Sequence, residues 1–258
     1  MEIEIDNIYN VDCLDGMQHI PPNSIDAVVC DLPYGTTSCP WDSVIPIEQL
    51  FAAYERILKP RGAIVLTCTQ PFTSKLVMSF PKLYRHQWIW VKNSVSGFAN
   101  AKVQPLRCFE DILVFGFQSP NYYPQGLLKV NTTRQNGRSV GGATLRGDVE
   151  ESKGKGNMRT QGSTYEQEFT NYPRQLLFFD KDTDAWHPTQ KPVDLIRYLV
   201  LTYTESGGVV LDNCIGSGTT AVACIKEKRH FIGFELNKEY YDKACKRIKA
   251  EQAQLSLF

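Results

Sequence analysis

Short apolar runs alternate with stretches of helical spacing along most of this chain, and that alternation is the strongest constraint on its fold. Buried strands are predicted at residues 5–11, 25–30, 63–68, 87–91, 111–117, 209–211 and 231–234. Helices are predicted between them at residues 14–20, 48–58, 71–80, 193–203 and 238–252, and through Val222 and Ile225. Strands that alternate with helices predict an α/β protein with a doubly wound, mainly parallel sheet.

The alternation is interrupted once, between residues 118 and 185. Aliphatic residues become sparse there, and glycines, polar residues and scattered basic residues dominate. A loop of this length inside a compact domain is usually functional or disordered. We therefore expect an insert at 118–185 with a modest core and a basic centre, which divides one domain into residues 1–117 and 186–258. A plain disordered linker is the alternative.

Charge and cysteine content limit the classes of protein to which this chain can belong. Lysine plus arginine number 28, as do aspartate plus glutamate, so a basic surface for nucleic acid must be local if it exists. The acidic N-terminus has no apolar signal region, and no apolar run approaches membrane-spanning length. The eight cysteines form no Cys-x-x-Cys pair. We expect reduced thiols in a cytoplasmic protein, in preference to disulfides or a metal site.

Two strand ends carry the candidate site residues. The first, Asp31-Leu32-Pro33-Tyr34, follows the predicted strand 25–30. In open α/β sheets ligands bind where strands end, and an acid, a proline and an aromatic residue there suggest a pocket for a flat, polar group. The alternative is a strand-end turn with a capping aspartate.

The second strand end leads into Gly216-Ser217-Gly218, before a predicted helix. Such a turn allows the backbone to approach a ligand closely, and Glu235 lies near the distance expected for an acid that binds a ribose. A nucleoside-containing cofactor is therefore expected. After this loop and the helix that it leads into, only one strand and one helix remain. A dinucleotide-binding domain normally continues for several more units, which argues against NAD. A sheet can be completed only with strands from earlier in the chain, as in a circular permutation.

Several motifs in this order together resemble the permuted beta group of amino-methylating DNA methyltransferases. They are Asp31-Leu32-Pro33-Tyr34, residues 89–93, residues 109–114, His187-Pro188-Thr189-Gln190-Lys191-Pro192 and the loop 212–220. The resemblance covers all of the chain except the insert. The chain departs from the family at Asn213 and Cys214, which replace a proline and an aromatic residue, and at Leu32, which is often proline.

The resemblance implies a Rossmann-like, S-adenosylmethionine-dependent enzyme that methylates adenine N6 or cytosine N4 in DNA after the base leaves the duplex. Asp31 and the backbone carbonyl of Leu32 would accept the two hydrogens of the amine and stabilise its developing positive charge. Pro33 would hold Leu32 extended, and Tyr34 would stack on the base. Aspartate at position 31, where relatives also use serine, favours adenine N6 over cytosine N4.

The resemblance also assigns residues to the cofactor and to DNA. The expected cofactor-binding residues are Asp12, Thr189, Lys191, Asp212, Gly216, Ser217, Gly218 and Glu235. For Lys191 a solvated side chain is an equal alternative. The insert would recognise the target sequence in double-stranded DNA, and its basic residues Arg134, Arg138, Arg146, Lys153, Lys155 and Arg159 are expected to contact it.

The C-terminal residues resemble the short peptide by which bacterial replication and repair proteins bind the sliding clamp. The residues that match are Gln254, Leu255, Leu257 and Phe258. The alternative is that the apolar residues fold back onto the sheet. Dimers occur in the family, so a homodimer stays open.

Two other functions compete with DNA methylation. One is N-methylation of an RNA base or a protein amide, because the chemistry of the Asp31 motif is shared. The other is a non-catalytic DNA-binding protein. The permuted order and the basic insert favour DNA, and the intact Asp31 motif and glycine loop favour catalysis. A restriction-modification role is expected of the family, although the sequence identifies no partner nuclease and no recognition sequence.

Overall fold

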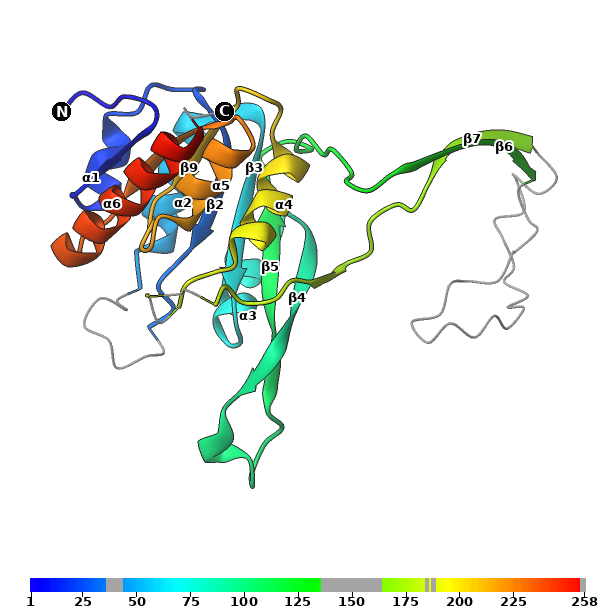
Figure 1. Ribbon diagram of the computed structural model, residues 1–258, viewed down its shortest axis with the longest axis horizontal. Coiled ribbons are helices and arrows are strands. Elements are labelled where there is room, and N and C mark those ends of the chain that lie inside the picture. Colours follow the sequence, from blue (N-terminus) through cyan, green and yellow to red (C-terminus); the bar gives the residue numbers. More distant parts are fainter. Residues whose placement is uncertain (36–43, 136–163, 184–185, 187–188, 256–258) are drawn as a thin grey trace. The chain divides into compact units, whose positions relative to one another are not determined.

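The computed structural model describes residues 1–35, 44–135, 164–183, 186 and 189–255 (Figure 1). It divides into two compact units, one of residues 1–123 with 174–258 and the other of residues 124–173. The first unit contains the large sheet, and the second contains a two-stranded ribbon.

Eight strands form the sheet of the first unit, in the order β1-β10-β9-β2-β3-β5-β4-β8. Their bounds are β1 Asn7–Tyr9, β2 Ile25–Asp31, β3 Leu58–Cys68, β4 Tyr84–Ser96, β5 Arg107–Phe115, β8 Leu176–Phe178, β9 Val209–Asp212 and β10 His230–Phe234. Neighbouring strands are parallel except that β5 is antiparallel to β3 and β4. The predicted α/β fold with a mainly parallel sheet is confirmed.

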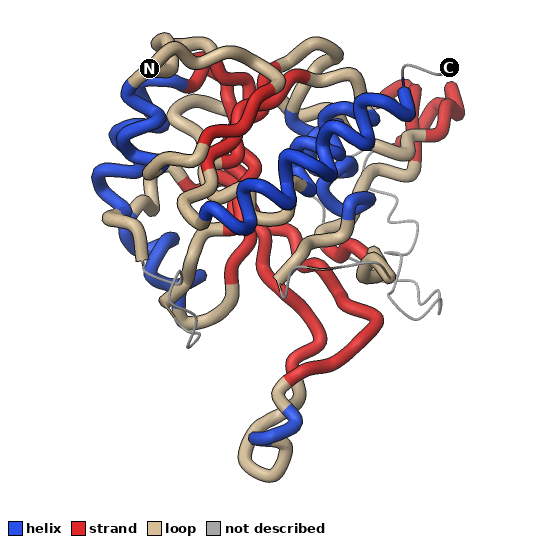
Figure 2. The backbone as a smooth tube through the Cα atoms, turned by 60° about the vertical axis from the view of Figure 1, so that its left-hand side comes forward, coloured by secondary structure: helices blue, strands red, loops and turns tan. Residues whose placement is uncertain are grey.

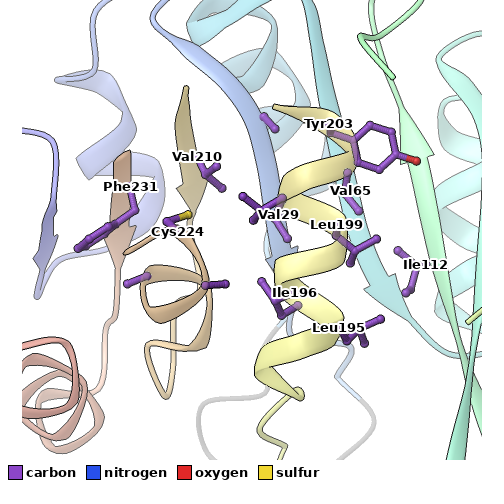
Figure 3. Close-up of a cluster of buried hydrophobic side chains, with 14 of the residues drawn as sticks. Val29, Val65, Ile112, Leu195, Ile196, Leu199, Tyr203, Val210, Cys224 and Phe231 are labelled. Carbon is purple, nitrogen blue, oxygen red and sulfur yellow. The ribbon is translucent and has the colours of Figure 1, made fainter. Parts of the chain in front are cut away.

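Helices cover both faces of this sheet, because successive strand residues point to opposite sides. On β2, Val28 and Cys30 pack into a cluster with α1 (Cys13–Gln18), α2 (Ile47–Ile57) and α3 (Phe72–Ser79). Ala27 and Val29 join the opposite cluster with α4 (Val193–Tyr203), α5 (Thr219–Lys226) and α6 (Lys238–Leu255). In Figure 3, Leu195, Ile196 and Leu199 of α4 lie over the strands. The apolar runs are buried on both faces, as expected for central strands of such a sheet.

Three strands extend by four or more residues beyond one of their predicted ends. β3 begins at Leu58, five residues before its predicted start. Ile25 of β2 pairs with Leu58 and Ala27 pairs with Ala63, so a register shift lets the strand include the Pro60-Arg61-Gly62 segment. β4 extends to Ser96 and β5 begins at Arg107, and these extensions pair with each other. Apart from Lys92 and Glu110, the residues of these extensions are exposed, so they lack the apolar alternation of a strand with one buried face.

The ends of the predicted insert belong to the first unit. Leu176–Phe178 forms β8, which pairs in parallel with β4 at the edge of the sheet. The second unit is correspondingly shorter than residues 118–185. Within it, β6 (Leu128–Gln135) and β7 (Thr164–Thr170) form an antiparallel ribbon. A strand as short as β8, without alternation, gives little sequence signal.

The described residues include no helix that combines the length and the apolar character needed to cross a membrane. The cysteines among these residues all carry free thiols. A cytoplasmic location stays a prediction.

Candidate active site

The strands β2 and β9 bring the two sequence motifs together, although the motifs are far apart in the chain. Ala27 and Val28 pair in parallel with Val210 and Leu211, so the carboxyl ends of the two strands adjoin. A cavity of about 490 Å³ opens there. Among the predicted site residues, it is lined by Asp12, Asp31, Leu32, Pro33, Tyr34, Thr189, Lys191, Asp212, Gly216, Ser217 and Glu235. Its volume suits a small organic ligand.

The carboxylate of Asp212 holds the loop that follows β9. It accepts hydrogen bonds from the Cys214 backbone N–H at 3.1 Å and from the Thr220 hydroxyl at 2.6 Å. Burial raises the pKa of Asp212 to about 6. The side chain therefore shapes one wall of the cavity through its contacts with the loop.

Glu235, at the end of β10, holds the same loop from the other side. Its two carboxylate oxygens accept from the backbone N–H groups of Gly216, at 2.9 Å, and Asn237, at 2.8 Å. Burial raises the pKa of Glu235. A carboxylate has about four lone-pair sites, so Glu235 can still accept hydrogen bonds from a ligand in the cavity.

Gly218 is not among the residues that line the cavity, and its contact with the cofactor stays a prediction. It is the N-cap of α5 with φ +79°, and a β-carbon built there would lie 3.4–3.5 Å from Ala244 and Ile248 of α6. The left-handed conformation explains the need for glycine. Its place in the fold is the turn into α5.

Asp12 both caps a helix and lines the cavity. Its carboxylate accepts from the Leu14 backbone N–H at 2.8 Å, which satisfies a free donor at the start of α1. The side chain is exposed at the cavity rim. The two interpretations of this residue, as a cap and as a ligand contact, are therefore compatible.

The residues that depart from the family pattern tie the loop to α2. The Tyr54 hydroxyl donates to Asn213 Oδ1 at 2.6 Å, and Asn213 Nδ2 lies 3.4 Å from Cys214 Sγ. Asn213 is buried, and Cys214 lines the cavity. A polar pair thus replaces the proline and the aromatic side chain at this wall.

The carboxylate of Asp31 receives donors from three separate elements. Its Oδ1 accepts from the hydroxyl of Tyr34, in the loop after β2, and from that of Thr67, on β3. Its Oδ2 accepts from the ammonium of Lys191, which precedes α4. Burial, followed by the charge of Asp31, raises the pKa of Tyr34, so this hydroxyl stays protonated and donates. The position of the carboxylate is fixed from several directions.

Lys191 extends this arrangement into a chain of charges that lines the cavity. Besides Asp31, its Nζ lies 3.5 Å from Glu110 Oε2, and Lys92 pairs with the other oxygen of Glu110. Lys191 is only 8% exposed, so the alternative of a solvated lysine is wrong. Burial alone would lower its pKa, but Asp31 and Glu110 outweigh burial and raise it. The two carboxylates and the two ammonium groups of this chain of charges therefore sum to no net charge.

Sequence reasoning missed Thr67, Lys92 and Glu110 as site residues. Two signals were available: Lys92 and Glu110 lie in the family-like motifs 89–93 and 109–114, and Glu110-Asp111 is a pair of acids at the start of an apolar run. Buried charges need partners, so such a pair indicates a polar site. Asp111 is satisfied elsewhere, by the Thr73 hydroxyl at 2.8 Å.

Most of the predicted DNA-binding residues lie outside the described residues. Arg134 belongs to β6, in the second unit. The others, Arg138, Arg146, Lys153, Lys155 and Arg159, are not among the described residues. Gln254 and Leu255 end α6, whereas Leu257 and Phe258 are not described.

Comparison with known proteins decides the family. A family model described as "DNA methylase", for N6 and N4 methylases, matches residues 25–246. The chain belongs to this family. It is an S-adenosylmethionine-dependent DNA amino-methyltransferase, and the predicted family is confirmed.

Individual relatives agree with this assignment. The chain is 27% identical to the type II methyltransferase M.HpaI of Haemophilus parainfluenzae, over 92% of this chain and 72% of that protein. It is 26% identical to the DNA adenine methyltransferase YhdJ of Escherichia coli (strain K12), over 95% of this chain and 83% of that protein.

Solved structures share the fold. The M1.HpyAVI–SAM complex matches with a TM-score of 0.62 at 21% identity, over 93% of this chain and 98% of that one. The PvuII DNA methyltransferase, described as cytosine-N4-specific, matches with a TM-score of 0.64 at 14% identity, over 98% of this chain and 93% of that one.

The charge chain predicts a measurable effect of Glu110→Gln on stability. The change leaves Lys191 and Lys92 with one carboxylate fewer, and we expect a loss of about 1–3 kcal/mol in the free energy of unfolding at pH 7. Urea unfolding measures it, with the exposed Glu48→Gln on α2 as the control, which should change little.

The pH dependence tests the same contact. Burial would raise the pKa of Glu110, but Lys191 and Lys92 outweigh it and lower the pKa below its ordinary value of 4.5. The stabilisation is therefore fully present above the ordinary pKa and is lost as pH falls through the lowered one. The difference between the parent and Glu110→Gln should shrink in acid. A difference that grows in acid would contradict the pairing.

Proposed function

We propose that this enzyme transfers the methyl group of S-adenosylmethionine to N6 of adenine in a specific sequence of double-stranded DNA, after the base leaves the helix. The observation that carries the proposal is the Asp31 carboxylate, held at the end of β2 in the cavity that the glycine loop also lines. An acceptor next to a cofactor loop is what methylation of an amine requires.

The exocyclic amine of the base is a poor nucleophile, because its lone pair is delocalised into the ring. Acceptors aimed at both of its hydrogens favour a tetrahedral nitrogen and stabilise the positive charge that develops on it. On Asp31, Oδ1 already accepts from two hydroxyls, whereas Oδ2 accepts from Lys191 alone among the described contacts. One amine hydrogen would therefore bond to Oδ2, and the other to the Leu32 carbonyl, which Pro33 helps to hold.

Lys191, Glu110 and Lys92 act as positioning residues in this proposal. The Lys191 ammonium locks Oδ2 in place, but its charge would also oppose the positive charge forming on the neighbouring amine. Glu110, 3.5 Å from the ammonium, offsets that charge, and Lys92 in turn balances Glu110. The Asp31 carboxylate is then oriented without a net cation beside the reacting nitrogen.

The residues on the other side of the cavity suit the cofactor. S-adenosylmethionine supplies an electrophilic methyl group on a sulfonium. Gly216 and Ser217 would allow close backbone approach, while Glu235, with Asp12, would accept from the hydroxyl and amino groups of the nucleoside. Thr189, which also lines the cavity, would contact the methionine portion, and Asp212 holds the loop that makes these contacts.

The choice of adenine over cytosine rests on the acid at position 31 and on one family relationship. The Escherichia coli relative, at 26% identity, is described as a DNA adenine methyltransferase. The fold itself does not discriminate, because the PvuII enzyme, described as cytosine-N4-specific, shares it. Cytosine N4 is the second candidate, since the same pair of acceptors suits its amine.

The second unit and the residues that connect its strands would recognise the target sequence. Its basic residues Arg134, Arg138, Arg146, Lys153, Lys155 and Arg159 would supply donors for bases and phosphates, and they outnumber the three acids of the same stretch, Asp148, Glu150 and Glu151. The two strands β6 and β7 give this region a regular frame.

Product analysis tests the proposed function. Duplex DNA is incubated with the enzyme and tritiated S-adenosylmethionine, then digested to nucleosides. We expect the label in N6-methyladenine. Label in N4-methylcytosine would overturn the choice of base, and no transfer to any DNA would overturn the function. As the control, Asp31→Ala should lose at least about 100-fold in transfer while it still binds the cofactor.

The C-terminal tail carries a separate proposal, that Gln254, Leu255, Leu257 and Phe258 bind the bacterial sliding clamp. It rests on the resemblance of the tail to clamp-binding peptides. We expect a purified clamp to bind the full chain and not a chain lacking residues 254–258, measured by surface plasmon resonance, with methyl transfer unchanged. Equal binding by both chains, or no binding by either, would end the proposal.

A further inference from the structure

The strands β4 and β5 continue past the sheet as a two-stranded arm, residues 93–109, whose tip contains the short 3₁₀ helix η1 (Phe98–Asn100) (Figure 2). Both β3 and β4 are antiparallel to β5, so β4 runs in the same direction as β3 and its parallel neighbour β2. The arm therefore leaves the sheet at the edge where Asp31 lies.

The register gives the reach of the arm. Asp31 pairs with Thr67, which pairs with Ile112, which in turn pairs with Trp88, so Trp88 marks the level of the catalytic carboxylate. β4 has a register shift between Val91 and Ser96, so the reach is counted along β5: Ser96 pairs with Arg107, which at about 3.3 Å per residue lies roughly 17 Å beyond Ile112. The major groove of DNA is only about 8.5 Å deep, so an arm of this length can cross it.

The chemistry of the arm suits nucleic acid. Its charged residues are Lys102 and Arg107, and residues 93–109 contain no acid. At the tip, Phe98 is 67% exposed and Val103 is 83% exposed. Backbone hydrogen bonds from Asn100 to Gly97 and from Gln104 to Asn100, of 2.9 and 3.0 Å, order the turn that presents them.

We propose that this arm enters a groove of the substrate duplex and that Phe98 and Val103 wedge into the base stack beside the target base. The inference rests on the proposed function in that the enzyme must extrude a base. A two-stranded ribbon fits the major groove, apolar side chains inserted between base steps unstack them, and Lys102 and Arg107 would pair with phosphates. By unstacking the neighbouring base steps, the wedge lowers the free energy needed to move the target base out of the duplex and toward Asp31.

The test separates extrusion from binding. Single-turnover methyl transfer is measured on two duplexes that carry the sequence mapped by product analysis, one fully paired and one with an abasic site opposite the target base. The unpaired base is already easier to extrude. We expect the double variant Phe98→Ala/Val103→Ala to lose about 10- to 100-fold on the paired duplex and at most about threefold on the abasic duplex.

Control variants localise the effect. Val95→Ala, on the stem of the arm and 42% exposed, should transfer at the parent rate on both duplexes. Lys102→Ala should weaken binding to a duplex of any sequence and lower the slope of log affinity against log salt by about one.

Three results would overturn the wedge. They are an equal loss on both duplexes, no loss on either, or a change in oligomeric state of the tip variant by light scattering, which would make the tip a contact between copies of this chain. The comparison of duplexes holds whether the methylated base is adenine or cytosine. Failure of the wedge is thus distinguishable from failure of the proposed function, which the product analysis alone decides.

Discussion

The ion pair between Lys191 and Asp31 is the interaction on which the rest of the candidate active site depends. The two residues lie 160 positions apart, one at the end of β2 and the other just before α4. A buried charge is strongly unfavourable unless it is paired, and here each ammonium lies against a carboxylate. The pair joins the part of the chain before the insert, which we propose carries catalysis, to the part after it, which we propose binds the cofactor. In the proposed function, the Tyr34 and Thr67 hydroxyls occupy Oδ1 of Asp31, which leaves Oδ2 for the substrate amine.

Much of the fold could be predicted from the sequence, because central strands buried on both faces leave long apolar runs. Val28 to Cys30 and Val210 to Leu211 are of this kind. The prediction failed where strands leave the sheet or lie at its edge. The arm, residues 93–109, is almost wholly exposed and shows no regular apolar period, and Leu176–Phe178 is too short to show one. Both depend on pairing with distant residues, which no local pattern contains.

The candidate site likewise contains some residues that could be predicted from the sequence and others that could not. The residues whose place follows from a strand end, such as Asp31, Gly216 and Glu235, could be predicted to line a cavity, and the structure places them there. Gly218 could not be separated from Gly216 by spacing, because only the packing of α6 shows which of the two faces the cavity. Thr67 is buried within a strand, where nothing local distinguishes it from other strand residues, and the acid pair Glu110-Asp111 indicates a polar site without showing which charges it contacts.

The most direct test of this account is a pair of measurements on Lys191→Met, which removes the charge and keeps much of the volume. If Lys191 orients Asp31, the single-turnover rate of methyl transfer at saturating cofactor should fall by about 10- to 100-fold. The dissociation constant for S-adenosylmethionine, measured by calorimetry, should stay within about threefold of the parent value. An unchanged rate with a cofactor affinity weakened by about tenfold or more would contradict the account and place Lys191 on the cofactor.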